Sequence, residues 1–352
     1  DGSSYGKTNH MVPEIYRTYG ILLLYSSFNE ISGNTVTVAS KLASVYPTTG
    51  ANASENSVVG IDIYYNSHNN TVSNNHISIN ANDNYIYGVG VLGHQTGHAA
   101  PAGQGAENNK FIGNDITLVG PYATTGIIIG QSSDGTIVSD NTVQIRSDIT
   151  YGVNLEGSHK TSLEGNDFNL TSQVAYGIEG FNSNDNTIGG NKILANAKQV
   201  YGVIISGNNN NIVNNDIMAN GTGEKPTFAD HDSFGSGNAG IYLFGNATNN
   251  IVKSNNITSQ KGFAVLIASS GNTIEDNYLI SEKGNSNAAI NTTSENTIKN
   301  NYQYTISGAF ESVVIPYLGS GFLVLNVQTP DGSSLDGALV SFYDSYGNLM
   351  AN

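Results

Sequence analysis

The sequence predicts an all-β protein that winds as a parallel β-helix of about ten coils. A six-residue motif, apolar-x-x-Asn-x-apolar, occurs ten times along the 352 residues. A second segment, Gly-apolar-x-apolar, lies about 9–12 residues before most copies of this motif. The unembellished spacing between copies is 25 residues, as from Gly152 to Gly177 to Gly202. Repetition at a fixed period of this length is typical of solenoid folds.

The six-residue motif keeps its asparagine in every copy, and only the last copy loses the final apolar residue, which is Gln303 there. Like residues of stacked coils lie one strand spacing apart, about 4.8 Å. Each side-chain N–H can therefore donate to the oxygen of the next asparagine, which keeps the buried amides satisfied. We predict a structural ladder made of Asn34, Asn75, Asn114, Asn141, Asn166, Asn191, Asn215, Asn255, Asn277 and Asn301.

Both repeated segments alternate with period two over three to five residues, which is the spacing of strands and not of helices. Gly, Asn, Asp and Ser fill the gaps and supply turns. Three short strands cannot bury a face alone, whereas stacked coils bury one continuous core. The second segment starts at Gly20, Gly60, Gly88, Gly126, Gly152, Gly202 and Gly240, is weaker at Gly177, and has Ala264 and Ala289 in place of glycine.

Over roughly residues 20–303 the chain resembles the right-handed parallel β-helix repeat proteins. It is most similar to the Asn-rich, adhesin-like surface proteins of methanogenic archaea, because it carries Asn-Thr-Ile/Val and Tyr-Gly-Val phrases. This resemblance implies a single-stranded, right-handed coil and a place on the cell surface.

Four regions are expected: a lead-in or cap at 1–19, the β-helix at 20–305, a linker at 306–320 and a β-module at 321–352. The last region resembles the opening of an immunoglobulin-like module, and its 32 residues fall short of the roughly 100 of a complete one. We therefore expect the natural chain to continue beyond Asn352. Long inserts lie between Asn34 and Gly60, between Asn215 and Gly240, and near 94–107.

The composition excludes several classes. The formal charge is −15 and Arg17 and Arg146 are the only arginines, so the chain lacks the positive field that nucleic-acid binding needs. The absence of cysteine excludes disulfides and thiolate metal sites. No apolar run approaches the ~20 residues of a membrane span, and no targeting segment is present.

No catalytic constellation is evident in the repeat, so the chain is predicted not to be an enzyme. A glycosidase needs two carboxylates on one groove, and among the central residues of the glycine segments Asp62 and Glu179 stand four coils apart. The residues after the ladder asparagines include Asp167, Lys192 and Asp216, which we interpret as a solvated salt ladder.

Two rows of side chains in the glycine segments are open to alternative interpretations. Strand parity puts the tyrosine before the glycine on the inward side, as a core or corner stack, with a sugar-stacking stripe as the alternative. The outward residue between the two inward apolar residues is itself apolar in five coils. These five side chains predict either a surface that a partner buries or scattered exposure without a role. The tyrosines are Tyr19, Tyr87, Tyr151, Tyr176 and Tyr201, and the five apolar residues form a column of Leu22, Ile128, Ile204, Tyr242 and Leu266.

The sharpest polar cluster is Asp230-His231-Asp232, near Glu224 in an insert. It could offer ligands to a cation such as calcium, although surface solvation is the favoured interpretation and no cofactor is predicted. Asn-x-Ser/Thr sequons indicate a glycoprotein only weakly, because an Asn-rich chain makes several by accident. Asn291 lies in a predicted strand, and the better candidates are Asn52, Asn69, Asn169, Asn220, Asn246 and Asn256.

These observations predict a non-enzymatic, secreted protein of the cell surface, either adhesin-like or a structural subunit of the envelope. The open ends of a β-helix also allow copies to assemble end to end into a filament. Expected partners are a cell-surface glycan, a protein or copies of the chain itself. The alternative is a polysaccharide lyase or glycoside hydrolase that acts on an extracellular glycan.

Overall fold

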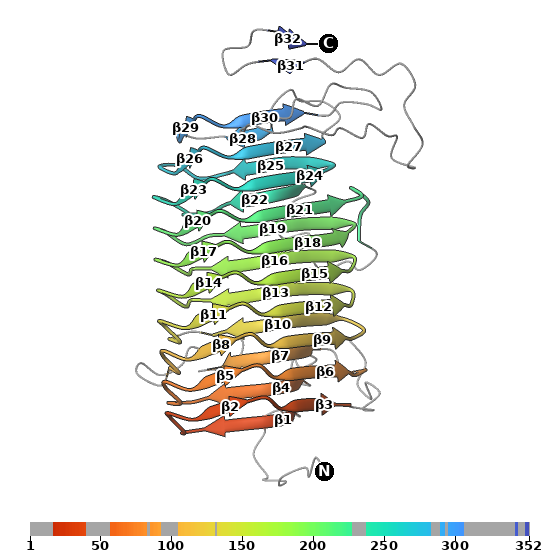
Figure 1. Cartoon of the computed structure of the whole chain (residues 1–352), viewed down its shortest axis with the longest axis vertical. Coiled ribbons are helices and arrows are strands. Elements are labelled where there is room, and N and C mark those ends of the chain that lie inside the picture. Colours follow the sequence, from red (N-terminus) through yellow and green to blue (C-terminus); the bar gives the residue numbers. More distant parts are fainter. Residues whose placement is uncertain are drawn as a thin grey trace, which may run out of the picture.

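The chain forms a rod of stacked coils built from three parallel sheets (Figure 1). A computed structural model describes residues 17–39, 57–82, 85–92, 105–130, 132–226, 237–282, 289–292, 295–305, 342–343 and 349–351. These residues contain strands and turns and no helix. The predicted all-β parallel β-helix of about ten coils is confirmed.

Each coil contributes one strand to each of three sheets, named A, B and C here, and each sheet has ten strands. Sheet A contains β1 (Arg17–Leu24), β4 (Ser57–Tyr64), β7 (Tyr85–Leu92), β10 (Ala123–Ile129), β13 (Ile149–Glu156), β16 (Val174–Phe181), β19 (Gln199–Ile205), β22 (Asn238–Leu243), β25 (Gly262–Ile267) and β28 (Ile290–Thr292). Sheet B contains β2 (Glu30–Ser32), β5 (Thr71–Ser73), β8 (Lys110–Ile112), β11 (Ile137–Ser139), β14 (Ser162–Glu164), β17 (Thr187–Gly189), β20 (Asn211–Val213), β23 (Ile251–Lys253), β26 (Thr273–Glu275) and β29 (Thr297–Lys299). Sheet C contains β3 (Thr35–Val38), β6 (His76–Asn80), β9 (Asp115–Val119), β12 (Thr142–Arg146), β15 (Asp167–Thr171), β18 (Lys192–Ala197), β21 (Asp216–Gly221), β24 (Asn256–Gln260), β27 (Tyr278–Glu282) and β30 (Tyr302–Thr305).

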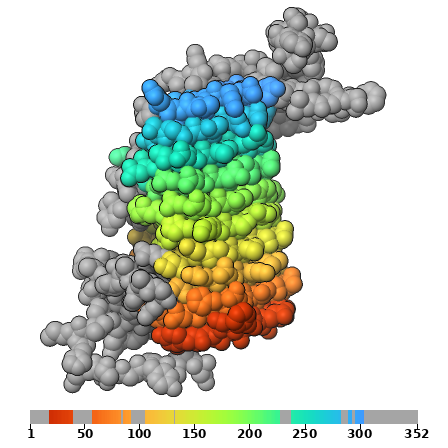
Figure 2. All heavy atoms as spheres, turned by 90° about the vertical axis from the view of Figure 1, so that its left-hand side faces the viewer, coloured from red at the N-terminus to blue at the C-terminus, as the bar shows by residue number. Residues whose placement is uncertain are grey.

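Successive coils lie in register over one another. Ile127 of β10 pairs with Val153 of β13, which in turn pairs with Ile178 of β16. The space-filling view shows the result as bands of successive colour along the rod (Figure 2). Residues that hold the same place in the repeat therefore form straight rows along the molecule, on its inside and on its outside.

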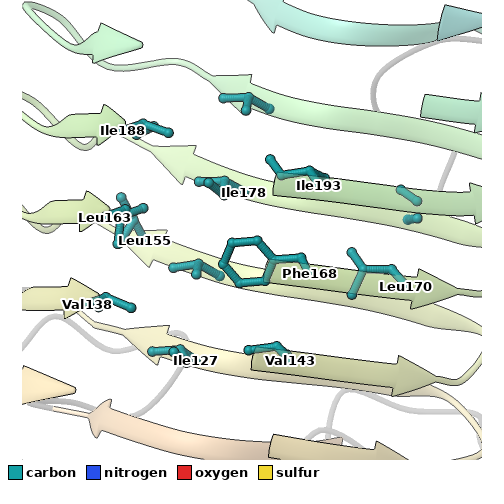
Figure 3. Close-up of a cluster of buried hydrophobic side chains, with 14 of the residues drawn as sticks. Ile127, Val138, Val143, Leu155, Leu163, Phe168, Leu170, Ile178, Ile188 and Ile193 are labelled. Carbon is teal, nitrogen blue, oxygen red and sulfur yellow. The ribbon is translucent and has the colours of Figure 1, made fainter. Parts of the chain in front are cut away.

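The inside of the coil is filled by rows of apolar side chains that run along the rod. Side chains from all three sheets converge there (Figure 3), among them Ile178 of β16, Leu163 of β14 and Phe168 of β15. All three are fully buried. Because the core is continuous from coil to coil, each coil shields the apolar faces of its neighbours, as expected for a solenoid.

The motif asparagines lie at the turn between sheets B and C and bond to one another from coil to coil. Asn191 Oδ1 accepts from the backbone N–H of Asn166 at 3.0 Å and from its Nδ2 at 2.9 Å. Asn191 Nδ2 donates to Asn215 Oδ1 at 3.0 Å and to the carbonyl of Leu163 at 2.8 Å. The same pattern runs through Asn34, Asn75, Asn114, Asn141, Asn166, Asn191, Asn215, Asn255, Asn277 and Asn301.

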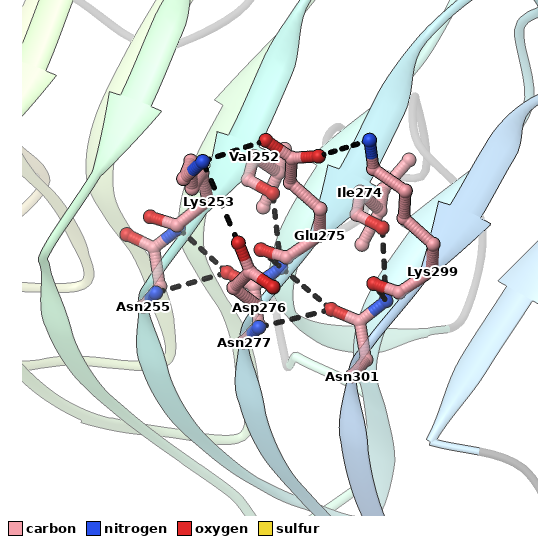
Figure 4. Close-up of polar contacts among 9 residues, drawn as sticks. All are labelled: Val252, Lys253, Asn255, Ile274, Glu275, Asp276, Asn277, Lys299 and Asn301. Atoms are coloured by element: carbon pink, nitrogen blue, oxygen red, sulfur yellow. Dashed lines mark hydrogen bonds and ion pairs between the residues drawn. The ribbon is translucent and has the colours of Figure 1, made fainter.

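Salt bridges lie on the surface beside this ladder (Figure 4). Glu275 accepts from Lys253 at 2.8 Å and from Lys299 at 2.7 Å, on adjacent strands of sheet B. The Lys253 bond lowers the pKa of the Glu275 carboxyl most, with Lys299 adding to it. On sheet C, Lys192 Nζ lies 3.4 Å from Asp167 at an exposed site, so part of the expected solvated salt ladder is present.

The predicted aromatic stack is present, since Tyr151, Tyr176 and Tyr201 stack on one another, but the expectation that this row faces the inside of the coil is wrong. A Cβ placed on Gly152 would lie 2.8 Å from Cδ1 of the core residue Phe168, so Gly152 faces inward, and Val153 also belongs to the core. Two successive inward residues reverse the alternation of the strand, as a β-bulge does. Tyr151 and its equivalents therefore point to the outer face of sheet A.

Two further expectations concern the C-terminal module and membrane-spanning segments. Near the C-terminus the described residues form an antiparallel pair, β31 (Phe342–Tyr343) and β32 (Leu349–Ala351). The rest of the predicted immunoglobulin-like module lies outside the described residues, and the module stays a prediction. No helix able to cross a membrane occurs in the part of the chain that is described.

The asparagine ladder predicts an unequal response to the same substitution at two sites. Asn191→Leu removes the acceptor of two N–H groups and the donor to two oxygens. Because a buried group left unsatisfied costs about 1–3 kcal/mol, we expect the free energy of unfolding to fall by roughly 3 kcal/mol or more. Urea denaturation followed by circular dichroism measures it. The control is Asn169→Leu, an exposed site on β15. Equal stability of the two variants would contradict the ladder's role.

Candidate active site

The outer face of sheet A carries a grid of side chains in which two glutamates lie on adjacent coils. Glu179 of β16 pairs with Asn154 of β13 in one direction and with Ile204 of β19 in the other. Glu156 ends β13 and pairs with Phe181, which ends β16. The two glutamates are thus diagonal neighbours on one face of a sheet, with Cα atoms about 7–8 Å apart.

A hollow of about 280 Å³ opens at these residues. Because Glu156 and Glu179 reach it from adjacent strands, both carboxyl groups can meet one bound molecule. The lining residues are Asn154, Glu156, Gly157, Glu179, Phe181 and Asn182.

Glu179 is surrounded by apolar side chains. Its row neighbour Ile204 is fully buried, and Tyr176 and Phe181 lie before and after it on the same strand. Burial in this setting disfavours the carboxylate and, with a smaller contribution from the charge of Glu156, raises the pKa of Glu179 to about 7. A large share of Glu179 is therefore protonated near neutral pH, and the residue can donate a proton.

Glu156 sits in a more polar setting. Burial raises the pKa of its carboxyl as well, but a hydrogen bond from Asn154 Nδ2 to Glu156 Oε1, 3.4 Å long, opposes this rise. The hydrogen bond favours the ionised form. The two carboxyl groups thus have different environments, and the pair can act as one acid and one base.

The side-chain oxygen of Asn154, Oδ1, has no hydrogen-bond partner in the protein. The residue is only 8% exposed, and its Oδ1 is buried without a hydrogen bond. Buried acceptors are normally satisfied, and an exception calls for an explanation such as a ligand or a water. Asn154 lines the hollow, so a rotation of its amide would bring this oxygen to an N–H or O–H of a bound molecule.

A stack of tyrosines borders the site. Tyr151 and Tyr176 are parallel with ring centroids 4.8 Å apart, and Tyr176 and Tyr201 follow at 5.7 Å. Tyr176 and Tyr201 are buried, so this part of the row is not available as a sugar-stacking stripe. Burial is the main cause that raises the pKa of the Tyr151 and Tyr176 phenols, and the nearby charge of Glu179 adds to it.

The apolar column on this face is not the exposed stripe that was considered. Ile128 and Ile204 are buried, Tyr242 and Leu266 are half-buried, and Leu22 is 40% exposed. Most of these side chains pack with the tyrosines in a second apolar cluster, which is separate from the core. This packing holds in place the apolar side chains that surround Glu179.

The candidate ligand and glycosylation residues lie elsewhere. Asp230, His231 and Asp232 fall outside the described residues, as does Asn52. Within the described ranges, no group of three or more His, Cys, Asp or Glu residues is placed to hold a metal ion. Of the sequon asparagines, Asn220 is half-buried within β21, and the exposed ones are Asn69, Asn169, Asn246 and Asn256. Glycosylation stays a prediction.

No catalytic residue was predicted from the sequence: Glu179 was noted only as too far from Asp62, and Glu156 was not considered. Glu179 stands two places after Gly177, at the central position of the glycine segment. Glu156 stands four places after Gly152, beyond that position. A comparison of the strand ends in adjacent coils would have placed Glu156 beside Phe181, one diagonal step from Glu179. This signal was present in the sequence.

Comparison with known proteins gives a family and a set of similar folds. Residues 105–303 match the family described as "Right handed beta helix region". No curated protein matches the chain. One similar solved structure is DFA-IIIase from Arthrobacter chlorophenolicus A6 in complex with GF2, with a TM-score of 0.49 and 18% identity, covering 72% of this chain and 66% of that one.

Two further solved structures have lower scores. A mutant of the periplasmic alginate epimerase AlgG has a TM-score of 0.46 and 14% identity, covering 82% of this chain and 72% of that one. The A-module of the mannuronan C-5 epimerase AlgE6 of Azotobacter vinelandii has a TM-score of 0.39 and 12% identity, covering 80% of this chain and 92% of that one.

The geometry of the hollow corrects the prediction of a non-enzymatic surface module. That prediction rested on the absence of two carboxyl groups on one surface, and the structure brings Glu156 and Glu179 to one hollow. The prediction that the chain is not an enzyme is wrong for the same reason.

The raised pKa of Glu179 predicts how stability depends on pH. Since this pKa is about 7 in the folded protein against 4.5 for an unperturbed glutamate, ionisation of Glu179 lowers the stability of the folded protein as the pH rises from about 4.5 to above 7. Glu179→Gln removes this cost. We expect its Tm to exceed that of the wild type by about 2–5 °C at pH 8 and to equal it at pH 4.

Differential scanning calorimetry at the two pH values measures this difference. The control Glu164→Gln changes an exposed carboxyl on β14 of sheet B and is expected to keep the wild-type dependence. A Glu179→Gln variant less stable than the wild type at pH 8 would show that the carboxylate is not under strain from burial.

Proposed function

Because the chain belongs to the right-handed β-helix family, with residues 105–303 matched, we propose that its outer face is an enzyme site that cleaves glycosidic bonds. The observation that carries this proposal is the pair of carboxyl groups of Glu156 and Glu179 at one hollow, in unlike environments. Glycosidases use such a pair, with one acid and one carboxylate on either side of the scissile bond.

Glu179 is the general acid in this proposal. It donates its proton to the oxygen of the leaving sugar, and the apolar side chains around it keep the proton bound near neutral pH. As the bond breaks, positive charge develops on the anomeric carbon and its ring oxygen.

Glu156 is the carboxylate that meets this charge. The amide of Asn154 holds it by a hydrogen bond and favours its ionised form. It either attacks the anomeric carbon or takes a proton from a water that attacks there. In the first route a water then displaces Glu156 from the sugar, and the proton that this water loses restores the acid on Glu179. In the second route the water oxygen also ends on the sugar, its proton stays on Glu156, and exchange with solvent returns both carboxyl groups to their starting states.

The proposal extends to where the protein works. An acidic chain without cysteine, with exposed sequon asparagines such as Asn69 and Asn246, suits an extracellular protein that meets polymeric glycans. The whole protein's substrate and partners belong to the same proposal, since this chain spans 66% of the DFA-IIIase structure.

Substitution of either glutamate tests the proposed roles. With a panel of neutral and uronate polysaccharides, new reducing ends are measured by a colorimetric assay. We expect Glu179→Gln and Glu156→Gln each to lower kcat by about 10²–10⁴-fold, while Glu164→Gln on sheet B keeps full activity. No turnover by the wild type on any glycan, or unchanged turnover by both variants, would refute the proposal.

The pH dependence of the wild type gives an independent check. Activity requires ionised Glu156 and protonated Glu179. The rate is therefore expected to rise with pH as Glu156 ionises and to fall above about 7 as Glu179 loses its proton. A rate that stays constant from pH 6 to pH 9 would exclude Glu179 as the acid.

A further inference from the structure

We infer that the substrate of this site is an uncharged glycan, recognised through its hydroxyl groups, and not a uronate polymer. This inference rests on the proposed glycosidase function and adds the chemical class of the substrate. Three features of the outer face of sheet A support it: the distribution of charge, the unpartnered oxygen of Asn154 and the exposed ring of Phe181.

Basic side chains are nearly absent from the strands that form this face. From β4 to β28 no strand of sheet A contains Lys, Arg or His, and Arg17 of β1 is the only basic residue in the ten strands that the structure describes. β1 lies four strand positions from β13, which is about 19 Å at ~4.8 Å for each coil.

Described lysines form their ion pairs on the other sides of the rod. Lys192 pairs with Asp167 on sheet C, and Lys253 and Lys299 pair with Glu275 on sheet B. The residues that line the hollow include no Lys, Arg or His, and the nearest basic residues along the chain are His159 and Lys160, in the turn that follows Gly157.

The site itself adds negative charge. Glu156 and Glu179 are its only titratable lining residues, and the whole chain carries a formal charge of −15. The carboxylate of a uronate would meet the negative charge of ionised Glu156 in a partly buried setting, where screening is weak, while Glu179, the acid, holds its proton. A neutral sugar meets no such repulsion.

The hydrogen-bonding character of the hollow fits hydroxyl groups. The buried Oδ1 of Asn154 has no partner and can only accept. A sugar hydroxyl supplies the missing donor, so this contact selects for a sugar, and the charge of Glu156 is what selects against a uronate. Ionised Glu156 is likewise an acceptor, so the wall matches a ligand rich in O–H donors.

Phe181 gives the hollow an apolar platform. It is 49% exposed, although it borders buried residues of sheet A, and it pairs directly with Glu156. An exposed ring of this kind can pack against the C–H face of a sugar ring. Packing beside the carboxyl pair would place a neutral sugar over the reacting groups.

The test compares matched substrates on the full chain. Oligosaccharides of fructose, glucose, galactose and xylose form the neutral set, and oligomers of galacturonate and mannuronate form the charged set. Methyl-esterified oligogalacturonate keeps the same skeleton without the charge. We expect turnover in the neutral set and none in the charged set.

Variants locate the effect at this site. Phe181→Ala is expected to raise KM for the neutral substrate about 3- to 10-fold with little change in kcat, and Phe181→Tyr to restore it. Asn182→Lys puts a cation on the wall of the hollow, at a positive φ that Lys160 and Lys261 also adopt in this chain. This variant is expected to gain binding of oligogalacturonate.

The outcomes separate the two proposals. Turnover of a uronate polymer by the wild type that is lost in Glu179→Gln would overturn the substrate class and leave the glycosidase function standing. Turnover and calorimetric binding of no glycan at all would overturn both. Turnover of a neutral oligosaccharide, with uronates neither bound nor cleaved, supports both.

Discussion

The stacking of each coil on an equivalent coil is the constraint on which the molecule depends. The asparagine amides enforce it, because each Oδ1 accepts two N–H groups from the neighbouring coil while its own Nδ2 donates onward. A slip by one residue would break these bonds and turn every core side chain outward. The straight rows on the outer face, and with them the meeting of Glu156 and Glu179, follow from this register.

Much of the fold could be predicted from the sequence, because a repeated pattern is averaged over many copies. The asparagine motif and the glycine segments defined the strands, their period and the core. The outer face could not be predicted in the same way. Simple alternation failed at Gly152, where two successive residues face inward, and the carboxyl pair occurs once, so no repetition draws attention to it.

The candidate site and the scaffold make opposite demands on stability. The ladder and the core lower the free energy of the folded chain, whereas a carboxyl group held among Ile204, Tyr176 and Phe181 resists ionisation. This tension is common where function requires a shifted pKa. A long rod with a continuous core tolerates one such group, because each coil is held by the two beside it.

The two acids stand 23 residues apart in the sequence and straddle a single junction between coils. Duplication or deletion of a whole coil anywhere outside this interval would change the length of the protein and leave the pair untouched. The same event inside the interval would separate the two acids or remove one of them. Lineages of this protein can thus vary widely in length while the stretch from β13 to β16 stays of constant size.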